Sequence, residues 1–255
     1  MKHIPNLFTL LNLFFGCIAI IYILQNGVII VANEEGAQWL DVPEKIWLGS
    51  LFIALAAVVD FLDGFVARLF NATSALGKQL DSLADCVSFG VAPGMIIYQF
   101  LRVSYASSPN ALELPVIYLL PAFLVPCAAA FRLGKFNLDD SQQYGFKGVP
   151  TPAAGLLIAS FPLIYWYFKD NADAMRLMLN QWLWYGIIIA VSALMVSNLP
   201  LMALKFKNFS VKSNFPKLIL LLAAIIAAIF LKWLAVPVVF ILYIILSLAF
   251  KNKTT

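Results

Sequence analysis

Charged side chains are scarce in this chain, since Asp, Glu, Lys and Arg make up only 12% of its 255 residues. A soluble domain carries about 25% of them. Apolar residues take their place at 62% of the sequence. They recur in runs of the ~20 residues that a helix needs to cross a hydrocarbon core. The composition therefore excludes a large soluble domain and predicts a polytopic membrane protein.

Histidine and cysteine are also rare. The chain has one histidine, His3, and three cysteines, Cys17, Cys86 and Cys127, without any C-x-x-C or Cys/His spacing. One histidine cannot build a His-based metal site or a Ser-His-Asp triad. Each cysteine falls in or beside an apolar run, so we expect all three to be small packed core residues. Any catalysis must rest on carboxylates together with Lys or Arg.

The apolar runs predict an all-α bundle of eight membrane helices with both termini in the cytoplasm. The predicted spans are residues 5–25, 46–69, 80–101, 112–132, 151–168, 182–204, 215–232 and 235–250. The last two can also be read as one broken hairpin around Lys232 and Pro237. This topology leaves only five of the 17 Lys and Arg outside, as the positive-inside rule favours. The net charge of +4 reflects that asymmetry, so we expect no nucleic-acid partner.

Four aspartates group at the junction of the second and third predicted spans. Asp60 and Asp63 are three residues apart and share one helical face, and Asp81 and Asp85 are four apart on the next helix. Small residues share these faces: Gly64, Ala67 and Gly77. Two acidic stripes at membrane depth repel unless a cation lies between them. Carboxylate oxygens suit Mg²⁺ or Mn²⁺, and a pair of such ions can clamp a diphosphate.

The same residues form a longer motif. It reads Asp60-x-x-Asp63-Gly64-x-x-Ala67-Arg68, then eight residues, then Gly77-x-x-x-Asp81-x-x-x-Asp85. All eight positions resemble the signature of the CDP-alcohol phosphatidyltransferases. Within that family, four segments resemble bacterial and archaeal phosphatidylserine synthases: IPNLFTLLN at 4–12, SFGVAP at 88–93, FRLGKFN at 131–137 and FKGVPTP at 146–152.

The resemblance implies roles for particular residues. Asp60, Asp63, Asp81 and Asp85 would hold two divalent cations, Mg²⁺ or Mn²⁺, and Asp85 would also be the catalytic base. A nucleotide site is implied at Asn6, Thr9, Gly64, Ala67, Arg68 and Gly77, and an acceptor or phosphate site at Arg132, Lys147 and Thr151. Plainer interpretations stay open at this point. Arg68, Arg132 and Lys147 also suit topology anchors, and Asn6, Thr9 and Asn12 share a face that can simply pack against other helices.

The implied reaction transfers the phosphatidyl group of CDP-diacylglycerol to L-serine and releases CMP. The resemblance places it in the inner membrane, among membrane lipids, in a homodimer whose active site faces the cytoplasm. We expect one integral membrane domain over 1–255, with the catalytic motif at 60–85, an acceptor loop at 132–151 and extra C-terminal spans at about 182–250. The alternatives are another acceptor, such as glycerol 3-phosphate or inositol phosphate, and a cation transporter. A transporter predicts acidic residues spread across the membrane, whereas these four lie together.

Overall fold

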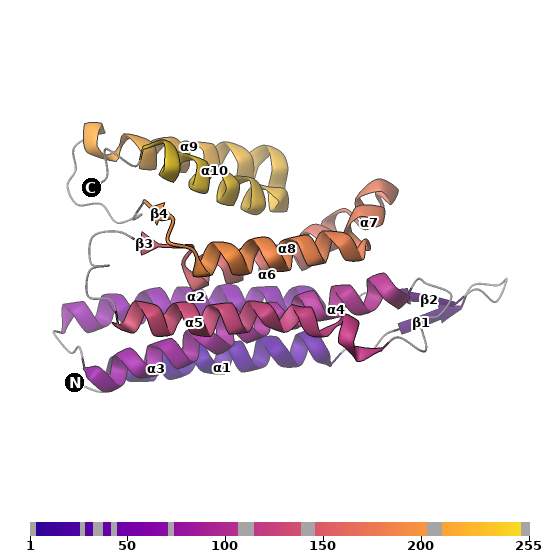
Figure 1. The fold of residues 1–255 in the computed structure, drawn as a ribbon, viewed down its shortest axis with the longest axis horizontal. Helices are drawn as coiled ribbons and strands as arrows, with labels where there is room; N and C mark the ends of the chain where they lie inside the picture. Colours follow the sequence, from indigo (N-terminus) through magenta and orange to yellow (C-terminus); the bar gives the residue numbers. More distant parts are fainter. Residues whose placement is uncertain are drawn as a thin grey trace.

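The computed structural model describes residues 4–25, 29–32, 38–41, 45–70, 74–106, 115–138, 146–202 and 211–250. These residues form a helical bundle with two small pairs of antiparallel strands, so the all-α prediction is confirmed (Figure 1). The α-helices are α1 (Ile4–Leu24), α2 (Ile46–Leu69), α3 (Ala75–Cys86), α4 (Ala92–Ala106), α5 (Leu124–Leu138), α6 (Thr151–Tyr167), α7 (Ala172–Met178), α8 (Gln181–Val196), α9 (Val211–Leu231) and α10 (Ala235–Ala249).

Shorter elements connect them. A π-helical turn, η1 (Val87–Val91), joins α3 to α4, and 3-10 turns lie at η3 (Val116–Tyr118), η4 (Leu120–Phe123) and η6 (Lys232–Leu234). A hairpin pairs β1 (Ile29–Ala32) with β2 (Gln38–Asp41), and a second antiparallel pair joins β3 (Phe146–Lys147) to β4 (Pro200–Leu201). This second pair ties the chain before α6 to the chain after α8.

Length and hydropathy identify four membrane-crossing candidates in the described part of the chain. They cover Pro5–Leu24, Ile46–Leu69, Ala75–Tyr105 and Asn214–Ala249, and the bent pair α7–α8 makes a fifth. Helices α5 and α6, with 15 and 17 residues, are shorter than a full span. The chain is thus a polytopic membrane protein. The eight predicted spans correspond to eight helical segments, of which not all are long enough to cross alone.

Three predicted boundaries were wrong for local reasons. The third helix begins at Ala75 rather than 80, because the Ser74 side chain caps it by accepting a hydrogen bond from the Gly77 N–H at 3.0 Å. The fourth extends past residue 132 to Leu138. The sixth ends at Val196 rather than 204, since the chain is already extended at Ser197 and Pro200 follows.

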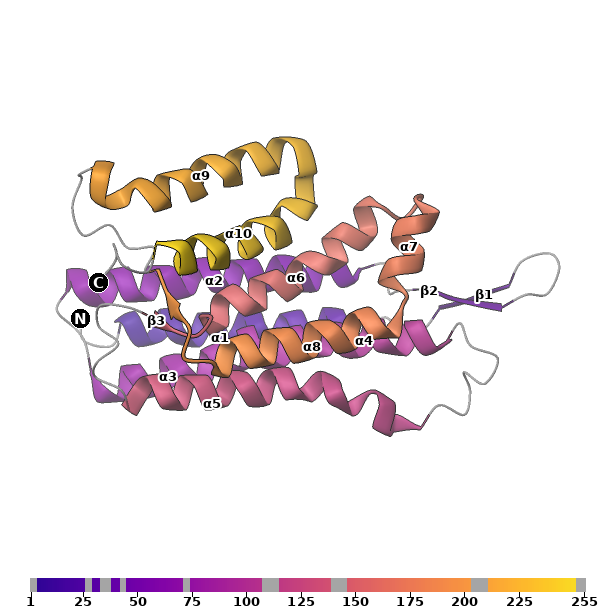
Figure 2. The ribbon, with the colours of Figure 1, turned by 45° about the horizontal axis from the view of Figure 1, so that its top comes forward.

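The C-terminal part is a helical hairpin. The chain reverses at Lys232, whose φ is +50°, and α9 then lies beside α10 (Figure 2). Met202 attaches α10 to the chain after α8: its carbonyl accepts a hydrogen bond from the Tyr243 hydroxyl at 3.0 Å, and its N–H donates to Ser247 Oγ at 3.2 Å. Figures 1 and 2 show that α1 begins and α10 ends at the same end of the bundle.

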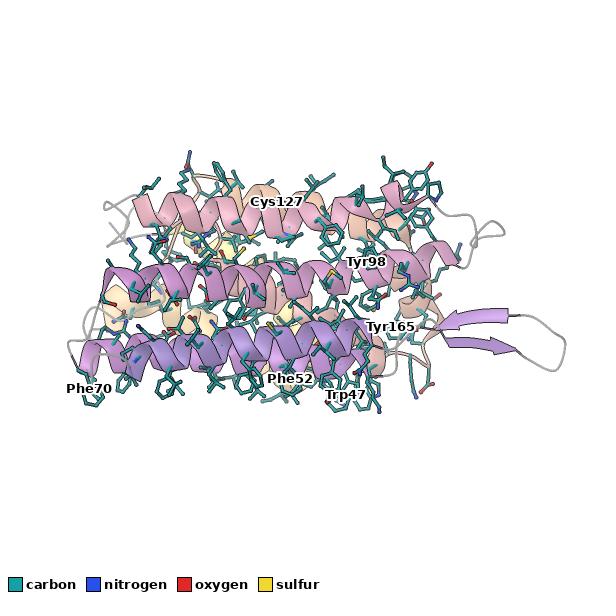
Figure 3. All side chains as sticks on the ribbon, turned by 90° about the horizontal axis from the view of Figure 1, so that it is seen from below. Trp47, Phe52, Phe70, Tyr98, Cys127 and Tyr165 are labelled. Atoms are coloured by element: carbon teal, nitrogen blue, oxygen red, sulfur yellow. The ribbon has the colours of Figure 1, made fainter. Side chains whose placement is uncertain are left out.

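The core lies around α4, while the outer faces remain apolar. The Trp184 ring stacks on Phe100 at 4.4 Å between centroids and is fully buried. Figure 3 shows Trp47 and Phe70 at opposite ends of α2, and both side chains are exposed. Such exposed apolar surface is expected where lipid is the solvent.

The cysteines correct one prediction. Cys17 and Cys127 are exposed rather than packed in the core, and Cys86 is half-buried. All three are free. In a bundle whose outside is as apolar as its inside, lying in an apolar run does not indicate which side a residue faces.

Candidate active site

The four aspartates meet where α1 packs against both α2 and α3. Asp60 and Asp63 come from α2 and Asp81 from α3, and each offers one carboxylate oxygen within 4.8 Å of the others. Asp85 lies outside this group of three, one turn further along α3. Asp60 links the two parts, since its carboxylate is within hydrogen-bonding reach of both Asp81 and Asp85.

This donor set fits a divalent cation. The three oxygens converge from two helices, and Asp81 Oδ1 is buried without a hydrogen-bonding partner in the described part of the chain. Buried carboxylate oxygens are normally paired, because an unpaired one is costly. Oxygen donors at this spacing are the ligands that Mg²⁺ and Mn²⁺ prefer.

Helix α1 supplies partners to one carboxylate on each neighbouring helix. The Thr9 hydroxyl donates to Asp63 Oδ2 at 2.8 Å and also lies 3.2 Å from the Pro5 carbonyl oxygen. One turn on, Asn12 Nδ2 donates to Asp85 Oδ1 at 3.2 Å. Asp63 and Asp85 are each only 7% exposed, so these contacts are shielded from solvent.

Helix α1 and the π-helical turn η1 approach each other closely at Gly16. A Cβ at this position would lie 2.3 Å from Ser88 Oγ and 2.9 Å from Ser88 Cα. The Ser88 hydroxyl in turn donates to the Asn12 carbonyl at 3.0 Å. The π-helical turn η1 begins two residues after Asp85, a type of bulge that often accompanies functional sites.

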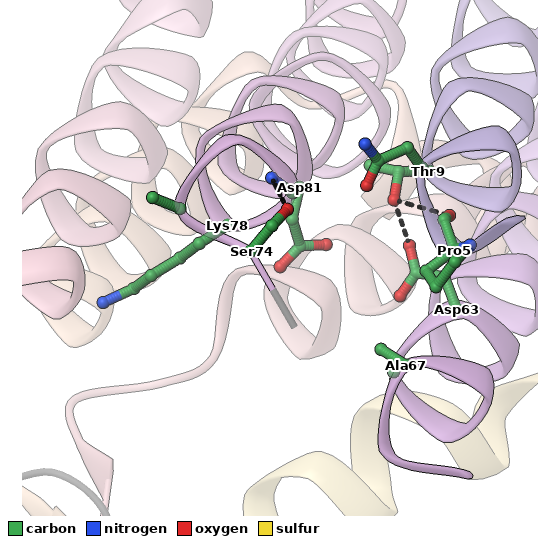
Figure 4. A pocket seen from close by; sticks show the side chains of 11 residues that line it. Pro5, Thr9, Asp63, Ala67, Ser74, Lys78 and Asp81 are labelled. Atoms are coloured by element: carbon green, nitrogen blue, oxygen red, sulfur yellow. Dashed lines mark hydrogen bonds between the residues drawn. The ribbon is translucent and has the colours of Figure 1, made fainter. Parts of the chain in front are cut away.

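A cavity of about 520 Å³ opens beside the carboxylates (Figure 4). Its lining includes five of the six residues predicted for the nucleotide: Asn6, Thr9, Gly64, Ala67 and Gly77. The sixth, Arg68, is exposed near the end of α2 and does not line the cavity. Asp63 and Asp81 form its acidic wall, and the remaining lining residues are Pro5, Ser74, Ala75 and Lys78.

The two glycines of the cavity differ in what surrounds them. A Cβ on Gly64 would meet only Arg68 Nη1, at 3.9 Å, so a side chain here would extend into open cavity. A Cβ on Gly77 would lie 3.0 Å from Asn6 Oδ1 and 3.1 Å from Ser74 Oγ. Gly64 therefore leaves open space in the cavity, whereas Gly77 allows α1 to approach α3.

Lys78 was not among the predicted site residues, although it follows Gly77 directly. Its Nζ donates to the Asn137 carbonyl at 3.1 Å, and Figure 4 shows the side chain directed away from Asp81. Asn137 Nδ2 also donates to Ser82 Oγ at 2.7 Å. These contacts join the start of α3 to the end of α5. In the sequence, Lys78 could have been recognised as a site residue from its position inside the motif.

Two of the predicted acceptor residues, Arg132 and Thr151, do not line this cavity. Arg132 is only 6% exposed, donates to Thr151 Oγ1 at 3.4 Å and lies close enough to Asp85 for an electrostatic interaction. Because α5 continues to Leu138, Arg132 lies inside the helix and not at its end as predicted. The backbone of Lys147 pairs with Pro200, but its side chain and the loop residues 139–145 lie outside the described residues.

Comparison with known proteins identifies the family of this chain. The family model for CDP-alcohol phosphatidyltransferases matches residues 2–184. The CDP-diacylglycerol–serine O-phosphatidyltransferase of Helicobacter pylori (strain J99) is 32% identical over 94% of this chain and 87% of its own length. Its counterpart in Bacillus subtilis (strain 168) is 33% identical over 65% of this chain and 78% of its own length.

An archaeal relative shares a shorter part of the chain. The archaetidylserine synthase of Methanothermobacter thermautotrophicus is 33% identical over 58% of this chain and 55% of its own length. Helices α9 and α10 lie beyond the family model, and the Helicobacter relative shows that similarity continues past it. Because the family model covers well over half of the chain and includes all four aspartates, the chain belongs to the CDP-alcohol phosphatidyltransferase family.

Proposed function

We propose that this chain transfers the phosphatidyl group of CDP-diacylglycerol to the hydroxyl of L-serine and releases CMP. The observation that carries the proposal is the convergence of Asp60, Asp63 and Asp81, of which Asp63 and Asp81 line a cavity of about 520 Å³. The printed names of the Helicobacter and Bacillus relatives support CDP-diacylglycerol and serine as the substrates.

The carboxylates suit a metal-assisted form of this reaction. Asp60, Asp63 and Asp81 would hold two divalent cations, Mg²⁺ or Mn²⁺, with Asp85 completing the second site. Bound there, the cations would supply positive charge to the diphosphate and to the departing CMP. The clearance at Gly64 leaves room for the nucleotide beside these oxygens.

We assign the proton transfer in this reaction to Asp85. The serine hydroxyl oxygen forms a bond to the phosphatidyl phosphorus, the bond from that phosphorus to the CMP oxygen breaks, and the hydroxyl proton passes to Asp85. Asn12 Nδ2 donates to Asp85 Oδ1, which orients this carboxylate. Since Asp85 is 7% exposed, water competes little for its oxygens.

We further propose that the site faces the cytoplasm of the inner membrane. The distribution of Lys and Arg supports this orientation, and α1 begins and α10 ends at the same end of the bundle. A fluorescent protein fused after Thr255 should therefore mature, whereas loss of fluorescence with intact expression contradicts it. A homodimer remains our proposal from the family resemblance, to be checked by the mass of the purified protein in detergent.

The direct test uses purified protein in lipid vesicles with CDP-diacylglycerol and either Mg²⁺ or Mn²⁺. We expect radiolabelled L-serine to enter the lipid fraction together with stoichiometric CMP. Parallel reactions with labelled glycerol 3-phosphate and inositol phosphate are expected to give no labelled lipid. Transfer to either phosphorylated alcohol, with none to serine, would overturn the serine assignment and leave the family membership intact.

Arg132 gives the first variant prediction. Its planar guanidinium can bind both oxygens of the serine carboxylate, which a lysine ammonium cannot do. We expect Arg132→Lys to raise the KM for serine about tenfold or more, because losing one charge-assisted contact removes on the order of 1–3 kcal/mol. The KM for CDP-diacylglycerol should not change, as measured by initial rates with each substrate varied.

Arg102→Lys is the matched control, because Arg102 bonds Gln99 in α4, away from the aspartates. It should leave both KM values unchanged. An unchanged serine KM in Arg132→Lys would indicate that Arg132 is only a topology anchor, and equal increases for both substrates would assign it to the lipid phosphate.

Gly64 gives a second variant prediction, at a residue that offers no side-chain atom to a metal ion. The Cβ of a valine here would meet only Arg68 Nη1, at 3.9 Å, and the side chain would extend into the cavity. We expect Gly64→Val to raise the KM for CDP-diacylglycerol about tenfold or more, with little change in thermal stability. Gly186→Val is the control, because open space also surrounds Gly186, on α8. Normal nucleotide-lipid binding by Gly64→Val would show that the cavity is not the nucleotide site.

A further inference from the structure

Two buried side chains that interact with Asp85 each have one polar atom without a hydrogen-bonding partner. One of these atoms is an acceptor and the other is a donor. Asn12 is fully buried and its Oδ1, a hydrogen-bond acceptor, has no partner in the described part of the chain. Arg132 is 6% exposed and its Nε, a donor, has none either. Buried polar atoms are rarely left without a hydrogen bond, so both atoms are available to bind a ligand.

The orientation of the Asn12 amide follows from its neighbour. A carboxylate only accepts hydrogen bonds, so the Asn12 group 3.2 Å from Asp85 Oδ1 is Nδ2. The carbonyl oxygen Oδ1 therefore turns away from Asp85. The backbone of Asn12 is fixed as well, since its carbonyl accepts a hydrogen bond from Ser88.

Arg132 is fixed in a similar way. One end of its guanidinium, Nη1, donates to Thr151, which is fully buried at the start of α6. Asp85 lies near enough for an electrostatic interaction with the guanidinium. The free Nε–H is part of the guanidinium edge that pairs with carboxylates through two parallel hydrogen bonds.

We propose that Asn12 Oδ1 and Arg132 Nε recognise the two charged groups of an α-amino-acid acceptor, the ammonium and the carboxylate. This inference rests on the proposed function and adds an ammonium contact to it. Asp85 interacts with both side chains and receives the hydroxyl proton of the same molecule. In this arrangement the hydroxyl, the ammonium and the carboxylate of serine would face Asp85, Asn12 and Arg132, respectively.

The neutral carbonyl of Asn12 suits the ammonium for an electrostatic reason. It accepts a hydrogen bond without adding a further negative charge to a site that already holds four carboxylates. An acceptor that carries phosphate instead of ammonium would place its oxygens against Asn12 Oδ1, where two acceptors repel. The pair therefore selects a zwitterion against an anion.

The test compares serine with 3-hydroxypropanoate, which keeps the hydroxyl and the carboxylate but lacks the ammonium. Both are assayed in vesicles containing CDP-diacylglycerol and Mn²⁺, serine as the labelled substrate and 3-hydroxypropanoate as the competitor. We expect Asn12→Ala to raise the serine KM about tenfold or more while the inhibition constant of 3-hydroxypropanoate stays unchanged. Any fall in kcat reports the lost donor to Asp85 and does not enter the comparison.

A second variant keeps the proposal testable if Asn12→Ala does not fold. Asn12→Asp has nearly the same shape and retains an acceptor for the ammonium, but it loses the donor to Asp85. It should lower kcat and keep the preference for serine over 3-hydroxypropanoate. Ser50→Ala removes another buried, unpaired oxygen, on α2 away from Asp85, and should change neither constant.

The outcomes separate this inference from the proposed function. Serine transfer by the wild type, with equal weakening of serine and 3-hydroxypropanoate in Asn12→Ala, overturns the ammonium contact and leaves the function standing. Loss of serine preference in Asn12→Asp overturns it as well. A wild-type enzyme that uses only acceptors without an amine overturns both.

Discussion

Asn in place of Asp60, Asp63 or Asp81 is expected to lower phosphatidyl transfer to below about a tenth of the wild-type rate, because each change removes one ligand from a coupled metal site. The three oxygens lie within 4.8 Å of one another, so loss of any one leaves the set incomplete. Folding should survive, since Asn has the same shape and reduces the repulsion among the carboxylates. The measurement is labelled-serine incorporation together with the thermal unfolding midpoint in detergent.

Asp173→Asn is the control for these variants. Asp173 is an exposed acid in the first turn of α7, so its loss should affect neither quantity. Chelation of the wild type should stop transfer, and added Mg²⁺ or Mn²⁺ should restore it. Activity well above a tenth of wild type in any of the three variants would refute the shared metal site.

Gly16→Val should disable the enzyme without changing any group that touches substrate. The new Cβ would lie 2.9 Å from Ser88 Cα, so α1 must move away from η1. Such overpacking costs about 1–3 kcal/mol of folding free energy. The larger effect is on activity: we expect about a hundredfold loss, because the contacts of Thr9 with Asp63 and of Asn12 with Asp85 both depend on the position of α1.

Thermal unfolding and initial rates measure the two effects of Gly16→Val. Gly186→Val serves again as the control for adding the same side chain to a membrane helix with free space around it. Transfer at the wild-type rate by Gly16→Val would show that α1 can shift without disturbing the aspartates.

The sequence was most informative about groups within one helix. The spacing of Asp60 and Asp63 predicted a shared face on α2, and oxygens of Asp60, Asp63 and Asp81 indeed lie within 4.8 Å of one another. Contacts between helices were harder to predict from the sequence. Helical periodicity gives the face on which a residue lies but not the residue that it contacts on the neighbouring helix. Asn12 was therefore recognised as a polar residue on a face with Asn6 and Thr9, while its contact with Asp85 came only from the structure.

Boundaries and exposure were harder to predict for physical reasons. The π-helical turn at Val87–Val91 changes the register after Asp85 without any change in hydropathy. Ser74 caps α3 from a polar stretch that hydropathy alone assigned to a loop. Cys17 and Cys127 face outward in runs as apolar as the core. In a membrane bundle, polar residues report position more reliably than apolar ones.

Helix α1 carries none of the four aspartates, yet it donates a hydrogen bond to one of them on each acidic helix. Thr9 and Asn12 are three residues apart, a rise of about 4.5 Å along the helix axis, and they hold Asp63 of α2 and Asp85 of α3. The offset between α2 and α3 along the helix axis therefore depends on the spacing of Thr9 and Asn12 on α1. Inserting one residue into α1 between the two would turn Asn12 by about 100° around the axis and break one attachment while keeping the other. The spacing of the acidic groups can therefore change through substitutions in a helix that contributes none of them.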